Sequence, residues 1–267
     1  MDKYAVFGNP IEHSLSPKIH SLFAQQVGIE LSYEKILAPE GGFVDSARAF
    51  IADGAKGFNI TVPFKLDAFA LANQHTPHAQ SAAAVNTIKV EGDTLIGHNT
   101  DGIGLVNDLM NNLGVELKGK IILILGAGGA TQGILLPLLE QNPRRVMIAN
   151  RTAAKAQQLK HDFAQYGKTC GFGLEKIKHD PVDIIINATS ASLDGKMPEI
   201  ASGCAQGALC YDLMYGKQTP FMDWAVNNQA AQVADGLGML VEQAAAAFVF
   251  WTGKTPDTQA VISELRR

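Results

Sequence analysis

The first hundred residues alternate between short, continuously apolar stretches and longer stretches in which apolar residues recur every three or four positions. The short stretches predict β-strands, and the longer ones predict amphipathic α-helices. Ser16 before Pro17 predicts a helix start capped by the serine, and Gly28 predicts the end of that helix. The strands are expected at residues 4–7, 31–37 and 57–61, and the helices at 17–27, 43–52 and 63–73.

A hairpin and a longer helix come next in the pattern. Residues 86–96 predict two short strands that turn at residues 91–93. Residues 100–113 predict an amphipathic helix that ends at Gly114. This helix is the expected bridge between two domains.

The second half of the chain opens with five apolar residues in a row, at positions 121–125. Such an unbroken run is typical of a strand that is buried on both faces of a parallel sheet. Together with the strands and helices that follow, it favours a doubly wound, Rossmann-type α/β sheet. The further strands are expected at 145–149, 183–187, 208–211 and 232–234, and the last two helices at 239–251 and 257–267.

The composition excludes several classes of protein. With 46% apolar and 18% charged residues among 267, the chain is a folded protein of one large or two modest domains. Its 22 basic and 26 acidic residues give a net charge of -4 without any basic block, so we expect no nucleic-acid partner. The chain shows neither a signal-peptide pattern nor an apolar run near the roughly 20 residues that span a bilayer, so we expect a cytoplasmic protein.

The cysteines and histidines give no sign of a disulfide framework or a metal site. Cys170, Cys204 and Cys210 are odd in number and form no Cys-x-x-Cys motif, which fits a reducing cytoplasm. Only His75 and His78 lie near each other among the seven histidines, and no carboxylate accompanies them at ligand spacing. We therefore expect no metal.

A glycine-rich loop follows the buried strand directly, and a helix over residues 134–140 follows the loop. The residues of the loop are Gly126-Ala127-Gly128-Gly129-Ala130. Glycine lets the backbone approach a pyrophosphate closely, and a helix N-terminus offers it N–H donors and partial positive charge. A glycine-rich turn without a ligand is the alternative. The strand–loop–helix context favours a dinucleotide site.

The end of the next strand indicates which dinucleotide binds. Units that bind NAD carry Asp or Glu there, which accepts hydrogen bonds from ribose hydroxyls. This chain instead has Asn150-Arg151-Thr152, with Lys155 one turn further on. Arginine presents a planar fork of donors to the 2'-phosphate of NADP. A solvated basic helix start is the alternative for Arg151 and Lys155. We predict NADP rather than NAD.

Polar residues at strand ends in the first half mark a second candidate site, because α/β proteins bind ligands at such places. Ser14 and Ser16 place two hydroxyls at a helix N-terminus, which suits a carboxylate, although capping alone explains one of them. Lys65 stands early on a predicted helix among apolar neighbours. Desolvation favours the neutral amine and a nearby carboxylate opposes this, so such a lysine can be tuned for proton transfer.

Two further polar positions have simple alternatives. Asp101 stands at the start of the bridging helix, where N-capping by itself accounts for an acidic residue. Asn86 and Thr87 stand where a strand begins, and polar residues there need no ligand.

The motifs together resemble one family over essentially the whole chain, the NADP-dependent shikimate dehydrogenases of the shikimate/quinate dehydrogenase family. They occur in the order of that family. They are Ser14-Leu15-Ser16-Pro17, Asn59-Ile60-Thr61-Val62-Pro63-Phe64-Lys65, Ala84-Val85-Asn86-Thr87, Asn99-Thr100-Asp101-Gly102, the loop 126–130, Asn150-Arg151-Thr152, Asn187-Ala188-Thr189-Ser190, Tyr211-Asp212-Leu213-Met214-Tyr215 and residues 235–243.

The resemblance implies a role for each candidate residue. Lys65 would be the catalytic acid/base, with Asp101 as its partner at the substrate. Ser14, Ser16 and Tyr215 would hold the substrate carboxylate. The residues that would bind the ring hydroxyls are Thr61, Asn86, Asp101 and Gln243. Those that would bind NADP(H) are Gly126, Ala127, Gly128, Gly129, Ala130, Asn150, Arg151, Thr152, Lys155, Leu213 and Gly236.

The resemblance also implies how the chain is divided. Residues 1–102 and 237–267 would form an α/β substrate-binding catalytic domain, to which the C-terminal helices return. Residues 103–236 would form the Rossmann-type NADP-binding domain. Residue Gln132 and the loop 191–196 depart from the family pattern. The departure at Gln132 leaves open whether this residue contacts a phosphate of the cofactor. A monomer and a homodimer are both compatible with the resemblance.

The expected activity is the reversible NADPH-dependent reduction of 3-dehydroshikimate to shikimate, on the route to chorismate and the aromatic amino acids. Hydride would reach the C3 carbonyl, and Lys65 would transfer the proton. One alternative is a quinate/shikimate dehydrogenase that uses NAD, against which Arg151 argues. A non-catalytic NADPH sensor is a second alternative, against which Lys65 and Asp101 argue. A methyltransferase is a third, but it would need an acidic residue where Asn150 stands.

Overall fold

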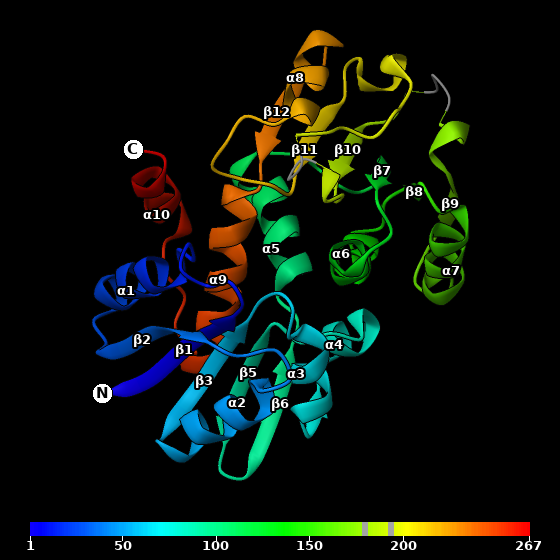
Figure 1. Cartoon of the computed structure of the whole chain (residues 1–267). Coiled ribbons are helices and arrows are strands. Elements are labelled where there is room, and N and C mark those ends of the chain that lie inside the picture. The colour runs from blue at the N-terminus through cyan, green and yellow to red at the C-terminus, as the bar shows by residue number, and fades with distance from the viewer. Residues whose placement is uncertain (178–180, 192–194) are drawn as a thin grey trace. The chain divides into compact units, whose positions relative to one another are not determined.

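The chain forms two α/β units, which a computed structural model describes over residues 1–177, 181–191 and 195–267 (Figure 1). The first unit consists of Met1–Gly104 and Leu240–Arg267, and the second of Leu105–Met239. The chain passes from one unit to the other inside two helices, α5 (Asp101–Asn107) and α9 (Leu237–Thr252). The C-terminal helices therefore belong to the first unit, as the resemblance implied. Residues 192–194 of the loop 191–196 lie outside the described residues.

The first unit is built on a mixed sheet of six strands among the described residues. Their order is β2-β1-β3-β5-β6-β4, with β1 parallel to β2 and β3, and β5 antiparallel to β3 and β6. The hairpin β5–β6 turns at Gly92, whose φ of 60° suits glycine. The strands are β1 (Asp2–Gly8), β2 (Leu31–Leu37), β3 (Ala55–Ile60), β4 (Gln74–His75), β5 (Thr87–Glu91) and β6 (Thr94–His98).

Helices cover both faces of this sheet. The core on one face joins α2 and α3 to β1 and β3 through aromatic side chains such as Phe7, Phe43 and Phe58. The core on the other face joins α1, α9 and α10 through Phe23 and Phe248. The helices are α1 (Ser16–Val27), α2 (Phe43–Ala52), α3 (Lys65–Leu71), α4 (Pro77–Ala82), α9 and α10 (Thr258–Leu265).

The second unit contains a fully parallel sheet of six strands among the described residues. Their order is β12-β11-β10-β7-β8-β9, which confirms the doubly wound prediction. The chain order reverses between β7 and β10, and ligands bind at such switch points, beyond the carboxyl ends of the strands. The strands are β7 (Ile121–Leu125), β8 (Arg145–Asn150), β9 (Thr169–Gly173), β10 (Ile184–Asn187), β11 (Leu209–Asp212) and β12 (Gln232–Asp235).

Alternate residues of β7 fill two separate cores, which explains why the strand is apolar throughout. Ile122 and Ile124 pack with α5, α6 and α7, whereas Leu123 and Leu125 pack on the other face with Phe221 of α8. The helices are α6 (Gly129–Glu140), α7 (Ala153–Phe163) and α8 (Pro220–Asn227), with a π-helical turn at Asp108–Asn112 and 3₁₀ turns at Leu174–Lys176 and Ser202–Ala205. No helix among the described residues is long and apolar enough to cross a membrane.

Several predicted boundaries differ from the structure. The first helix begins at Ser16 itself, and no side chain caps it, so the prediction that Ser16 caps this helix is wrong. Helix α6 begins at Gly129 rather than at residue 134, because the glycine loop itself enters the helix. The helix expected at 100–113 ends in the π-helical turn, where Leu113 N donates to Asp108 O. The short strands β4 and β9 had no counterpart in the prediction.

Candidate active site

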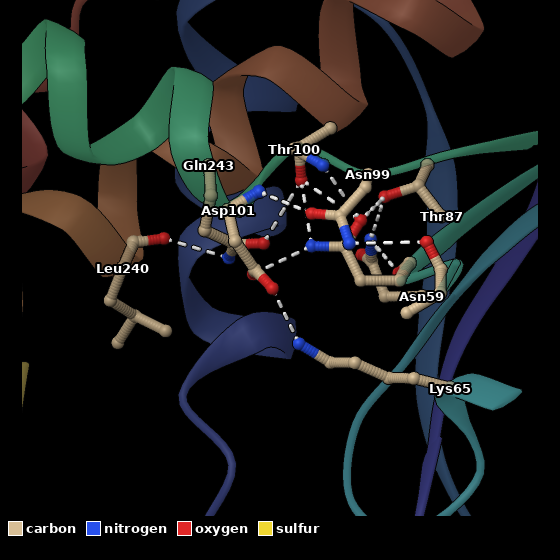
Figure 2. A network of polar contacts seen from close by, with 10 residues as sticks. Asn59, Lys65, Thr87, Asn99, Thr100, Asp101, Leu240 and Gln243 are labelled. Atoms are coloured by element: carbon tan, nitrogen blue, oxygen red, sulfur yellow. Dashed lines mark hydrogen bonds and ion pairs between the residues drawn. The ribbon is translucent and has the colours of Figure 1, made fainter. Parts of the chain in front are cut away.

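The central polar contact of the first unit joins Lys65 to Asp101. Lys65 is the first residue of α3 and Asp101 the first of α5, and Lys65 Nζ lies 2.6 Å from Asp101 Oδ2 (Figure 2). The two side chains are 30% and 16% exposed, so a substrate can reach them. A lysine paired with a carboxylate at partial exposure can both donate and accept a proton during a reaction.

Asp101 is held from its other oxygen as well. Asn86 Nδ2 donates to Asp101 Oδ1 across 2.8 Å. The backbone N–H of Asp101 donates to Asn99 Oδ1, so the side chain of Asn99 is the hydrogen-bond acceptor at the start of α5. The Asp101 carboxylate instead contacts Lys65 and Asn86. N-capping, which was the simpler interpretation of Asp101 taken alone, does not describe its contacts.

Strand pairing explains why these residues meet. The residues 61–65 follow the carboxyl end of β3, Asn86 precedes β5, and Thr100 and Asp101 follow β6. Because β5 runs antiparallel to β3 and β6, all three chain segments come to the same edge of the sheet. Val85 N also donates to Lys65 O across 3.0 Å, which fixes the backbone of Lys65 beside Asn86.

Asn86 is the centre of a buried network rather than a merely polar strand start. It is 3% exposed, and its carboxamide contacts Thr87, Thr100 and Asp101. Thr100 Oγ1 in turn donates to Gln243 Oε1 of α9 across 3.3 Å, and Gln243 Nε2 donates to Leu240 O (Figure 2). The network therefore brings together Lys65, Asn86, Asp101 and Gln243.

Thr61 and the two serines lie outside that network. Thr61 is half-buried, its N–H donates to Phe7 O, and its hydroxyl has no hydrogen bond to any described residue. Ser14 Oγ donates to Ser16 Oγ across 3.2 Å and accepts from Ser16 N. The serine hydroxyls thus form a pair at the start of α1, with no helix-capping role for either.

The glycine loop of the second unit leaves room for a ligand. Gly126 has a φ of 106°, and a Cβ there would lie 3.0 Å from Ala188 O, so a side chain at this position would be strained. A Cβ at Gly128 or Gly129 would meet no atom within 4 Å, and no side chain caps α6. Gly128, Gly129 and Ala130 are exposed, whereas Ala127 is half-buried. An open helix N-terminus of this kind fits the pyrophosphate of a dinucleotide.

The basic residues after β8 are also exposed. Asn150 Nδ2 donates to Thr152 O across 2.9 Å and closes the turn that precedes α7. Arg151 and Lys155 make no hydrogen bond or ion pair with any described residue, so both charges are accessible to a phosphate.

The remaining predicted residues follow β11 and β12. Leu213 N donates to Asn187 O, and Gly236 N donates to Met214 O. A Cβ at Gly236 would lie 2.3 Å from Leu213 O, so only glycine allows these two loops to approach so closely. Tyr215 belongs to this second unit, whereas the serine pair belongs to the first, and burial raises the pKa of the Tyr215 phenol.

Sequence reasoning gave no role to several polar residues that are buried or half-buried. Asp212 is fully buried at the end of β11, where it accepts from Thr219 Oγ1 and from Met214 N and so holds the loop that carries Leu213 and Tyr215.

The network around Asn86 in the first unit includes three more such residues, Asn59, Thr87 and Tyr33. The available signal was polarity within a predicted strand or directly after it. Among the described residues, no cluster of three or more His, Cys, Asp or Glu residues is arranged to hold a metal.

Three family models match the chain in succession. Residues 6–88 match the shikimate dehydrogenase substrate binding domain, residues 108–195 match shikimate / quinate 5-dehydrogenase, and residues 236–266 match the shikimate 5'-dehydrogenase C-terminal domain.

Whole-chain relatives agree with these matches. The chain is 71% identical to the shikimate dehydrogenase (NADP(+)) of Ruthia magnifica subsp. Calyptogena magnifica over 100% of both chains. An Ael1 enzyme from Pseudomonas putida is 44% identical with a TM-score of 0.96, over 99% of this chain and 98% of that one. The shikimate 5-dehydrogenase of Thermus thermophilus, solved with NADP(H) and shikimate, is 32% identical with a TM-score of 0.88, over 100% and 99% of the two chains.

Proposed function

Because the chain belongs to the shikimate dehydrogenase family, we propose that it reversibly reduces 3-dehydroshikimate to shikimate with NADPH, using Lys65 as the acid/base. The observation that carries this assignment of Lys65 is its 2.6 Å contact with Asp101 at partial exposure. The reaction needs one group that gives a proton to an oxygen and takes it back, and a lysine beside a carboxylate is suited to that task.

The proton step follows from the chemistry of this pair. NADPH, when bound, supplies the hydride that reaches the C3 carbonyl carbon. As the carbonyl oxygen gains the electron pair, the Lys65 ammonium gives it a proton, and the hydroxyl of shikimate results. The neutral amine that remains is the base for the reverse direction. Asp101 keeps the ammonium in place beforehand and, with Asn86 on its other oxygen, stays fixed while the lysine changes charge.

The groups proposed for the rest of the substrate come from the first unit, apart from Tyr215 of the second unit. The hydroxyls of Ser14 and Ser16 are proposed to hold the carboxylate, together with the phenol of Tyr215. Thr61, Asn86, Asp101 and Gln243 are proposed to bind the ring hydroxyls. The hydroxyl of Thr61 supports this role, because it has no partner among the described residues and stands four positions before Lys65. The carboxamide of Gln243 supports it too, because it contacts Thr100, which is itself a partner of Asn86.

The second unit is proposed to bind NADP(H). Its exposed glycine loop and uncapped helix α6 suit the pyrophosphate, and Arg151 and Lys155 suit the 2'-phosphate. Residues 1–102 with 237–267 would then be the substrate-binding domain, and residues 103–236 the cofactor domain. We also propose a cytoplasmic location, where the free thiols Cys170, Cys204 and Cys210 would stay reduced, and either a monomer or a homodimer.

A four-way assay of the purified full-length chain tests the function. Reduction of NADP⁺ or NAD⁺ is followed with shikimate or with quinate as the alcohol. We expect the highest kcat/KM with shikimate and NADP⁺. Efficient turnover of quinate or NAD⁺ would indicate the broader quinate/shikimate branch instead. Absence of turnover in all four mixtures, with NADPH still bound, would indicate a sensor and would overturn the proposal.

A further inference from the structure

A continuous chain of four hydrogen bonds runs from Tyr33 to the carboxylate of Asp101. Tyr33 OH donates to Asn59 Oδ1 across 2.7 Å, and Asn59 Nδ2 donates to Thr87 Oγ1 across 2.9 Å. Thr87 Oγ1 donates to Asn86 Oδ1 across 2.9 Å, and Asn86 Nδ2 donates to Asp101 Oδ1 across 2.8 Å. Figure 2 shows Asn59 and Thr87 in the same network as the Lys65–Asp101 pair.

The chemistry of these groups fixes the direction of the chain. An ionised carboxylate only accepts, so Asn86 must present its Nδ2 to Asp101 and its Oδ1 to Thr87. Thr87 then uses its hydrogen towards Asn86 and accepts from the Nδ2 of Asn59. The Oδ1 of Asn59 is left to accept from Tyr33. Every donor in the chain therefore points towards Asp101.

The surroundings make these bonds stronger than they would be in water. Thr87 is 0% exposed, Asn86 3% and Asn59 7%. Burial raises the pKa of the Tyr33 phenol well above its ordinary value, so the phenol stays a donor. In a low-dielectric interior, hydrogen bonds in series polarise one another, and breaking one weakens those beyond it.

The sheet sets the positions of the members. Asn59 of β3 lies directly opposite Thr87 of β5 in the antiparallel register. Tyr33 lies on β2 and reaches past β1, which stands between β2 and β3. Its ring stacks on His20 with centroids 4.4 Å apart and planes 9° apart, so the phenol has little freedom to turn away from Asn59.

We propose that Tyr33, Asn59 and Thr87 are positioning residues for the reaction, which orient the Asn86 carboxamide and through it the Asp101 carboxylate beside Lys65. This inference rests on the proposed function. None of the three is assigned to the substrate, and Tyr33 is four hydrogen bonds away from Asp101. Asn86 is also proposed to bind a ring hydroxyl, but it keeps its hydrogen bonds with Thr100 when the chain is broken. Loss of the chain should therefore lower kcat by more than it raises KM for shikimate.

The first test is Tyr33→Phe, which removes one hydroxyl and keeps the ring. We expect kcat for shikimate oxidation to fall about 3- to 10-fold, with KM for shikimate and for NADP⁺ within about twofold of the wild type. The matched control is Tyr4→Phe. Tyr4 is the register neighbour of Tyr33, is buried and stacks on Trp251, and its hydroxyl has no hydrogen bond to any described residue. Its kcat should match the wild type.

The second test breaks the chain in the middle and repairs it. Thr87→Val replaces the hydroxyl by a methyl group of similar size, and we expect a larger loss of kcat, about 10- to 100-fold. Thr87→Ser keeps the hydroxyl and should recover most of that loss. The double variant Tyr33→Phe/Thr87→Val should be no slower than Thr87→Val, because both changes interrupt the same chain.

The outcomes separate the inference from the function on which it rests. A wild-type chain that does not oxidise shikimate overturns the proposed function. An active wild type with normal kcat in folded Tyr33→Phe overturns the inference alone. A raised KM for shikimate at unchanged kcat also overturns the inference, because it would mean that Tyr33 acts through the Ser16 side chain, which interacts with its phenol. A multiplicative loss in the double variant overturns it as well. Folding of each variant is checked by its thermal unfolding midpoint, and a folded Thr87→Ser without recovery also counts against the chain.

Discussion

The carboxylate of Asp101 receives Lys65 Nζ on one oxygen at 2.6 Å and Asn86 Nδ2 on the other at 2.8 Å. Asp101→Asn keeps the shape of the side chain but leaves one acceptor oxygen in place of two. The new amide NH₂ group must therefore face the donor of either Lys65 or Asn86, and that hydrogen bond is lost. We expect kcat/KM for shikimate to fall about 10²-fold or more, because both partners lose their orientation. NADPH affinity, measured by fluorescence titration, should stay unchanged. Activity within tenfold of the wild type would contradict this role of Asp101.

Arg151 should decide between the two nicotinamide cofactors. A charge-assisted hydrogen bond contributes about 1.5 to 3 kcal/mol, so Arg151→Ala should raise KM for NADP⁺ roughly 10- to 100-fold. The KM for NAD⁺, which lacks the 2'-phosphate, should change less than about twofold. The control is Arg144→Ala, which removes the same charge from an exposed residue just before the opposite end of β8. Equal changes for both cofactors in Arg151→Ala would refute the proposed phosphate contact.

His20 should make the protein less stable in acid. It is 0% exposed, its ring nitrogens have no hydrogen-bond partner among the described residues, and burial lowers its pKa from 6.5 to about 3. Between these two values the unfolded chain binds a proton that the folded chain does not. The free energy of unfolding therefore falls as the pH drops from about 6.5 to about 3, by up to about 1.4 kcal/mol per pH unit from this residue.

The measurement is urea unfolding of His20→Phe between pH 6 and pH 4. The slope of the unfolding free energy against pH should be smaller than that of the wild type by about 1.4 kcal/mol per pH unit. His20→Leu differs in packing but should show the same smaller slope. An unchanged slope in both variants would mean that His20 is protonated in the folded protein.

A buried pair in the second unit should matter for stability. Tyr211 OH donates to Asp108 Oδ2 across 2.5 Å and accepts from Met239 N, which ties β11 to the π-helical turn and to the start of α9. Tyr211→Phe should cost about 2 kcal/mol and lower the unfolding midpoint by roughly 4 to 8 °C. Tyr166→Phe, at an exposed residue, is the control and should leave the midpoint within about 1 °C. Equal midpoints for the two variants would contradict the importance of the pair.

Hydrophobic patterning predicts those elements that bury one clear face. The predicted range 43–52 coincides with α2, which lies between Gly42 and Asp53 and buries Phe43, Ala47 and Phe50 on one face. Strand β4 has only two residues and is held by pairing with β6, so no periodicity can reveal it. Strand β9 contains two glycines among its five residues and lies at a sheet edge, where apolar alternation is weak.

The site shows a similar division. Motifs and strand ends predict that Lys65 and Asp101 matter, although they are 36 positions apart. The contact between Asn59 and Thr87 depends on the register of β3 with β5, which no local pattern contains. The contact of Tyr33 with the network likewise depends on the order of the strands, because its partner Asn59 lies on β3, two strands away from β2. Ser16 was expected to cap α1 from its sequence position alone, but the backbone places it inside the helix.

The most direct test of the account is the kcat of Lys65→Met for shikimate oxidation by NADP⁺, measured together with NADPH binding. Methionine keeps the length of the side chain and removes the only group proposed to transfer the proton. We predict a loss of about 10²- to 10⁴-fold in kcat with an unchanged dissociation constant for NADPH, whereas Lys56→Met, at an exposed position of β3, should be fully active. A Lys65→Met enzyme that turns over within tenfold of the wild type would contradict the account.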